Sequence, residues 1–183
     1  MIFRLFRKDP RRVLIASLYK RVADSSRVPG LYSALGIPDT LEGRFESLSL
    51  HMVLTLRALR PLPAPADDVA KDLTDAFFAD LDASLREMGA GDTAVPKRMK
   101  KLASSFYGRA HAYDGPLDTR DVAALANALG RNACGSDAPA LSLARYALAA
   151  DEALKQADLA SLMERGPVFP KPDAFAGEER HDA

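Results

Sequence analysis

Apolar residues recur at steps of three and four along almost the whole chain, and this spacing constrains the fold more than any other feature. It is clearest over residues 41–60, where one face carries Leu41, Phe45, Leu48, Met52, Leu56 and Leu59. Such a repeat is typical of an α-helix, and Leu50, Val53 and Leu54 widen its apolar face almost all the way round. No run alternates apolar and polar residues as a β-strand would. The sequence therefore predicts an all-α protein with this helix at its centre.

Prolines and glycines divide the rest of the chain into further helices. The spacing predicts them over residues 11–24, 31–35, about 67–88, 96 to about 113, 119–129 and 138–164, with Asp118 or Thr119 opening the helix over 119–129. About seven helices with short loops predict a single compact domain over residues 11–166. Residues 1–10 form a basic, amphipathic N-terminal segment, and residues 167–183 form a polar tail that we expect to be disordered.

The composition excludes several classes of protein. The 183 residues are 48% hydrophobic and 27% charged, which is ordinary for a globular chain. A single cysteine, Cys134, cannot form an internal disulfide, which suits a reducing compartment. No stretch approaches the roughly 18 uninterrupted apolar residues of a membrane span, so we expect a soluble, cytoplasmic protein.

No arrangement typical of an active site is present in the sequence. The histidines are not paired on a helix face, so they predict no metal site. His51 falls in the most apolar helix, where a hydrogen-bonded core histidine is the expected role. An enzyme that pairs His51 or His111 with a carboxylate is the weaker alternative. We therefore expect no catalytic residue, no metal and no cofactor.

The charges balance to a formal net of +0 but are unevenly distributed. Residues 1–30 hold eight basic and two acidic side chains, and residues 67–92 hold eight acidic and two basic ones. Residues 96–113 carry five cations and no acid. These blocks either pair with each other across neighbouring helices or produce an electrostatic field that attracts oppositely charged partners. A ribosome- or RNA-binding module acting through the basic helix at 97–109 is the alternative function that this pattern supports.

The first eight residues combine apolar and basic side chains. They are Ile2, Phe3, Leu5 and Phe6 with Arg4, Arg7 and Lys8. Such a segment can contact an anionic membrane surface weakly and reversibly, so peripheral membrane contact is expected here.

Gly108 lies in the middle of the predicted helix over 96–113. A glycine there costs about 1 kcal/mol relative to alanine. We expect close packing against a neighbouring backbone to compensate, with a ligand as the alternative.

Several motifs in order along the chain resemble the ubiquinol-cytochrome c chaperone family in its alphaproteobacterial form. They are the stretch from Leu31 to Glu46, continued by Leu50, His51 and residues 54–59, then the stretch from Phe77 to Gly89, the pair Gly91 and Asp92, and the stretches from Val95 to Lys100 and from Phe106 to Arg109. The resemblance covers roughly residues 10–165. It implies a non-enzymatic assembly factor for respiratory complex III that binds newly made cytochrome b or its nascent chain. Mitochondrial relatives work near the ribosomal tunnel exit with a small partner protein.

A client made of apolar helices should be met by an apolar groove with charge at its rim. The candidate contact residues are the members of the family motifs that we expect to be exposed: Tyr32, Asp39, Arg44, Asp80, Asp82, Arg86, Lys97, Arg98, Lys101, Tyr107 and Arg109. Asp80 and Asp82 have a structural alternative, which is pairing with Arg86 or with the lysines. We expect the protein in the cytoplasm, at the inner face of the cytoplasmic membrane.

Overall fold

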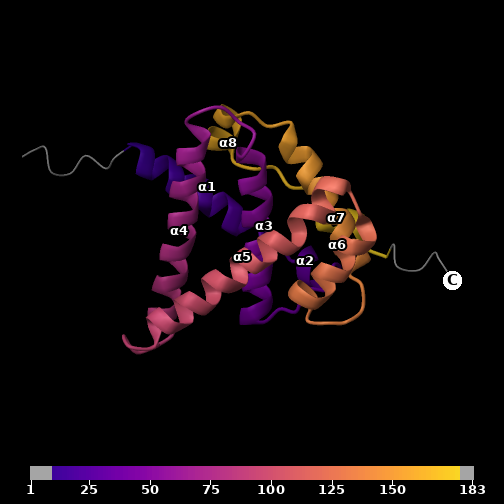
Figure 1. Ribbon diagram of the computed structural model, residues 1–183, viewed down its shortest axis with the longest axis horizontal. Helices are drawn as coiled ribbons and strands as arrows, with labels where there is room; N and C mark the ends of the chain where they lie inside the picture. The colour runs from indigo at the N-terminus through magenta and orange to yellow at the C-terminus, as the bar shows by residue number, and fades with distance from the viewer. Residues whose placement is uncertain (1–9, 178–183) are drawn as a thin grey trace, which may run out of the picture.

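The most apolar helix, α3 (Leu41–Leu59), runs through the middle of the molecule and is buried along most of its length (Figure 1). The structure is a computed structural model and describes residues 10–177. At the start of α3 the Thr40 hydroxyl accepts a hydrogen bond from the Gly43 amide at 3.1 Å, which satisfies one free amide of the first turn. Because apolar side chains lie on most sides of α3, other helices cover most of its surface.

Two groups of helices enclose α3. On one side lie α1 (Pro10–Ser25) and α4 (Ala66–Glu87), which pack on each other and on α3. On the other side lie α6 (Val122–Leu129) and α7 (Leu141–Lys155), with a π-helical turn, η1 (Gly130–Cys134), after α6. The long helix α5 (Val95–Thr119) crosses the molecule and joins the two groups (Figure 1).

The described residues form helices and no strands, which confirms the all-α prediction. They include seven helices of seven residues or more, together with α2 (Gly30–Ser33), which is a single turn. No helix among residues 10–177 is both long and apolar enough to cross a membrane.

Two predicted helix boundaries were wrong. First, α5 continues through Gly115 and Pro116 and ends at Thr119; the next residue, Arg120, has a φ of 55°, in the left-handed region, and ends the helix. The next helix is opened by Asp121, whose carboxylate accepts from the Ala124 amide at 2.9 Å, and not by Asp118 or Thr119.

Second, the long helix predicted over 138–164 is divided into α7 and α8 (Leu159–Arg165). Asp158 causes the division, because its carboxylate accepts from the Ser161 amide at 2.7 Å and starts a new helix. The apolar spacing continues across the break, which is why the sequence suggested one helix.

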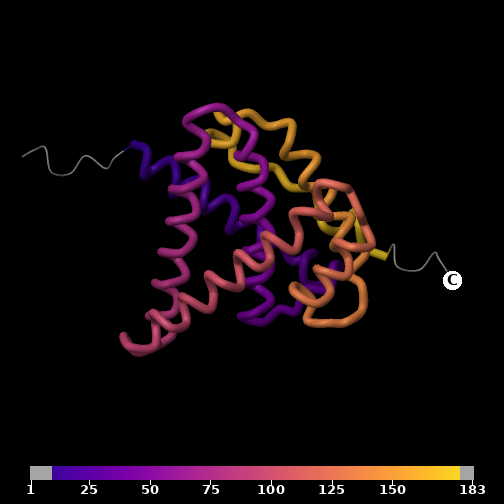
Figure 2. Tube along the Cα trace, viewed as in Figure 1, coloured from indigo at the N-terminus to yellow at the C-terminus, as the bar shows by residue number. Residues whose placement is uncertain are grey.

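The segment after α8 runs back across the molecule, and its side chains pack against the hydrophobic core (Figure 2). Phe169 meets the His51 ring edge-on with ring centres 4.6 Å apart, and Phe175, in the short 3-10 turn η2 (Pro172–Phe175), meets Tyr146 at 5.8 Å. Residues 167–177 are therefore part of the packed structure, contrary to the expectation of a disordered tail. Residues 178–183 lie outside the described residues.

An ion network joins α3, α5 and α7. The guanidinium of Arg57, only 7% exposed, donates to Asp151 at 3.0 Å and to Asp118 at 2.6 Å, and it also contacts Asp114. Lys155 pairs with the second oxygen of Asp151 at 2.8 Å. Burial alone would lower the pKa of Arg57, but the bonds to Asp118 and Asp151 outweigh it and raise that pKa.

Candidate functional site

An apolar groove opens between the first turns of α3, the last turns of α4 and the first turns of α5. It encloses about 350 Å³. Its apolar lining consists of Leu41, Phe45 and Leu48 from α3, Leu81, Leu85 and Met88 from the end of α4, and Leu102 from α5. The groove is wide enough for bulky side chains of another chain, and its apolar walls favour apolar ones.

Two of these side chains are far more exposed than the sequence suggested. Leu41 is 60% exposed and Met88 is 52% exposed. Both fall in the apolar stripes of their helices, so periodicity assigns them to the core. They lie at helix ends that no further helix of residues 10–177 covers, and the apolar stripe is therefore exposed there. An exposed apolar groove of this kind is typical of an interaction site.

Charged groups stand at the rim of the groove. Arg27, Arg44 and Asp80 line its edge. Arg44 pairs with Asp39 at 2.7 Å, and this hydrogen bond lowers the pKa of the Asp39 carboxyl. Asp80 accepts from the Tyr19 hydroxyl at 2.7 Å; burial, together with this bond, raises the pKa of Tyr19. Arg44 and Asp80 were predicted contact residues, and the structure brings them to the same groove.

Other predicted contact residues have internal partners. Arg109 makes a two-pronged contact with Glu46 at 2.7 and 2.9 Å, and both side chains are largely buried. Arg86 pairs with Asp82 at 2.7 Å, which is the structural role left open for that carboxylate. The Tyr32 hydroxyl donates to the Ser26 carbonyl at 2.8 Å. Arg109 in particular ties α5 to α3, and the expectation that it is exposed was wrong.

The remaining candidates gather on the exposed side of α5. Lys97, Arg98 and Lys101 are exposed, and with Lys100 they line a shallow hollow of about 630 Å³. Within residues 10–177 none of the four makes an ion pair. We call these four residues the α5 cationic cluster. Farther along the helix Tyr107 is 57% exposed, and its ring contacts Phe78 and Phe106.

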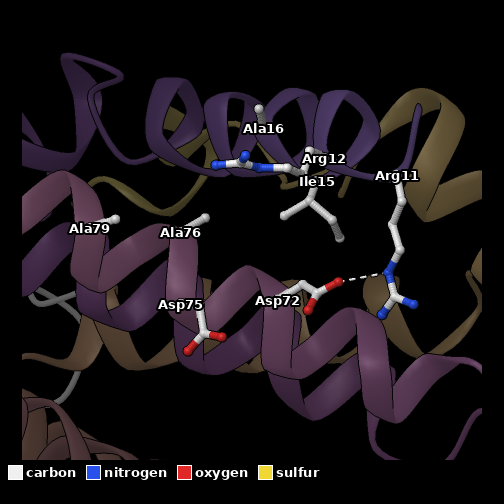
Figure 3. Close-up of a pocket in the computed structure, with 8 residues that line it drawn as sticks. All are labelled: Arg11, Arg12, Ile15, Ala16, Asp72, Asp75, Ala76 and Ala79. Atoms are coloured by element: carbon white, nitrogen blue, oxygen red, sulfur yellow. Dashed lines mark hydrogen bonds and ion pairs between the residues drawn. The ribbon is translucent and has the colours of Figure 1, made fainter. Parts of the chain in front are cut away.

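The other charge blocks compensate each other internally, at least in part. Figure 3 shows the hollow between α1 and α4, where Arg11 donates to Asp72 at 2.7 Å. Arg11 also lies 3.9 Å from Asp68. Arg11 of α1 and the acidic α4 therefore pair across neighbouring helices, whereas the α5 cationic cluster has no ion pair within residues 10–177. The membrane contact expected of Ile2 to Lys8 lies outside the described residues.

His51 is a core histidine, as predicted. Its Nδ1 lies 2.7 Å from the Ser47 carbonyl, which can only accept, so Nδ1 carries the proton and Nε2 accepts from the Tyr146 hydroxyl at 2.8 Å. Complete burial lowers the pKa of His51 to about 4, against the opposing effect of the Ser47 bond. No carboxylate contacts the ring within residues 10–177. His111 is exposed on α5.

The packing explanation for Gly108 was wrong. A Cβ built at this position would meet no atom within 4 Å, and the residue is exposed. By contrast, a Cβ at Gly43 would lie 1.9 Å from the Pro38 carbonyl oxygen, so the chain entering α3 depends on a glycine there.

Fold and surface together describe a helical protein with two exposed surfaces, an open apolar groove and, beside it on α5, a cationic hollow. The comparisons identify its family. A model of the ubiquinol-cytochrome C chaperone family matches residues 33–169. The chain belongs to this family, which confirms the resemblance seen in the sequence motifs.

A solved structure supports the same assignment. The crystal structure of the Cbp3 homolog from Brucella abortus matches with a TM-score of 0.80 and 36% sequence identity, over 94% of this chain and 98% of that chain. No curated protein that was compared matches the sequence.

Proposed function

We propose that this protein is a non-enzymatic chaperone in the assembly of respiratory complex III, and that it binds newly made cytochrome b through the apolar groove. The observation that carries the proposal is the exposure of Leu41 and Met88 at the mouth of that groove. Membership in the ubiquinol-cytochrome C chaperone family supports the role in complex III assembly. The groove supplies a surface on which an apolar segment can be held away from water before it packs elsewhere.

The chemistry of the groove fits a single apolar helix as the bound segment. Side chains at steps of three and four would enter between α3, α4 and α5 and contact Phe45, Leu81 and Leu102. Burial of a leucine or methionine side chain stabilises a complex by about 1.5–3 kcal/mol. Arg44 and Asp80 line the groove, and burial of either charge under a bound apolar segment would be costly, so the apolar contacts are expected along the α3, α4 and α5 walls.

The test replaces the two exposed side chains with polar ones of similar size. Leu41→Gln combined with Met88→Gln should reduce the capture of newly made cytochrome b by at least about tenfold, because two apolar contacts are lost. The matched control is Leu14→Gln with Val168→Gln, at apolar residues exposed elsewhere. The groove variant should also lower the amount of assembled complex III in cells.

Two results would contradict the proposal. One is normal complex III in a strain that lacks the protein. The other is equal loss of cytochrome b capture by the groove variant and the control variant. Ribosome co-sedimentation measured on the same strains shows whether capture occurs on the nascent chain, in the cytoplasm beside the membrane.

A further inference from the structure

The α5 cationic cluster differs from the other basic regions of the described chain in lacking acidic partners. On α1, Arg11 and Lys20 pair with Asp72 and Asp24. Arg57 on α3 and Arg60, the residue after α3, pair with carboxylates of α5 and α7. Lys97, Arg98, Lys100 and Lys101 are close together on fewer than two helical turns, and their mutual repulsion is uncompensated in the part of the chain that the structure describes. Such a patch attracts an anionic surface.

The cluster adjoins the apolar groove at Arg98. Arg98 and Leu102 are four residues apart on α5, so they lie one above the other on the same face, and Leu102 lines the groove. Met88, the residue that ends α4, lines the same groove as Leu102. Figure 2 shows that the turn joining α4 to α5 projects from the rest of the molecule. Apolar and cationic side chains therefore share one exposed edge.

We propose that this edge docks the protein on a bilayer with anionic phospholipid headgroups. The inference rests on the proposed function, since it would place the mouth of the groove at the bilayer, where a bound apolar helix can leave the groove. The cations would lie among the headgroups, and Met88 would reach toward the acyl boundary. Release of the client then needs no passage through water.

The residue types favour lipid over RNA. Three of the four cations are lysines, whose aliphatic stems can lie along an apolar boundary while the ammonium groups stay among headgroups. RNA recognition favours stacking on exposed aromatic or guanidinium planes. Within the hollow lined by the cluster there is no aromatic residue, and the nearby Tyr107 ring is already in contact with Phe78 and Phe106.

The test measures flotation of the full chain with vesicles. It compares phosphatidylglycerol mixed with phosphatidylcholine against phosphatidylcholine alone. The variant Lys97→Gln, Arg98→Gln, Lys101→Gln should bind the anionic vesicles roughly a hundredfold more weakly, at about fivefold for each cation removed. The matched control removes three exposed cations from other regions, Lys71→Gln, Arg131→Gln and Lys171→Gln, and should bind like the original chain.

A third variant, Arg4→Gln, Arg7→Gln, Lys8→Gln, separates the cluster from the basic N-terminal segment. The inference is overturned if the original chain does not bind anionic vesicles, if only the N-terminal variant loses binding, or if the cluster is needed for single-stranded RNA binding and not for vesicles. Cytochrome b capture by the cluster variant is measured in parallel. If the original chain does not bind anionic vesicles but captures cytochrome b normally, the docking surface is refuted and the proposed function is not.

Discussion

The buried histidine makes stability depend on pH in a way that can be calculated. His51 is neutral in the folded protein because burial lowers its pKa to about 4, whereas in the unfolded chain its pKa is about 6.5. Acid therefore protonates the unfolded chain first, and stability falls as the pH drops from above 6.5 toward 4. Between pH 7 and pH 5 the linkage amounts to about 2 kcal/mol.

The assay is urea unfolding followed by circular dichroism at pH 7 and pH 5. The variant His51→Gln removes the titrating group, and carboxylates that also respond to acid are common to both proteins and cancel in the comparison. Between pH 7 and pH 5 the free energy of unfolding should fall by about 2 kcal/mol more in the original chain than in the variant. In parallel, the NMR chemical shifts of the His51 ring should be those of a neutral imidazole down to pH 5.

Two outcomes would refute this reasoning. Equal losses of stability in the original chain and the variant would show that His51 does not carry the effect. Titration of the His51 ring near pH 6.5 would show that the ring is open to water and that the contacts with Tyr146 and Phe169 do not hold in solution.

The remaining predictions concern the core and the helix starts. Arg57→Met should destabilise the fold by about 3–5 kcal/mol by leaving Asp151 buried without its guanidinium, and Asp151→Asn in the same background should restore part of the loss in urea unfolding. An unchanged free energy of unfolding in Arg57→Met would show that the ion pairs of Arg57 with Asp151 and Asp118 do not form in solution. Gly43→Ala should destabilise by about 1–3 kcal/mol through its clash with Pro38, whereas Gly108→Ala, which meets no atom, should stabilise by up to about 1 kcal/mol. Equal melting temperatures for the two alanine variants would contradict both assignments.

The sequence was sufficient to predict the helices because burial of one face dictates their apolar spacing. It was less reliable at helix ends, because a single capping side chain determines where a helix begins. Asp121 and Asp158 start helices by accepting one amide hydrogen bond each, and nothing in the apolar pattern shows which of several polar residues does so. The ordered segment after α8 was missed because Phe169 and Phe175 stand in a stretch rich in proline and glycine without helical spacing, and their partners lie far away in the sequence.

For the candidate site, the sequence located charges but not their partners. Arg109 and Glu46 are 63 residues apart, so their pairing appears only when α3 and α5 pack together. The same holds for the groove. Leu41 and Met88 continue the stripes of buried helices, and only the arrangement of neighbouring helices shows that both are left open to solvent. Arg44 and Asp80 could be predicted because they lie in family motifs.

The central claim, that the groove holds cytochrome b, is tested most directly by site-specific crosslinking in cells. A photoreactive amino acid at position 88, at the mouth of the groove, is compared with the same group at position 14, an apolar site on α1 that is 45% exposed against 52% for Met88. The account predicts a crosslink to newly made cytochrome b from position 88 and none from position 14. Crosslinks to cytochrome b from position 14 alone, or from neither position, would contradict it.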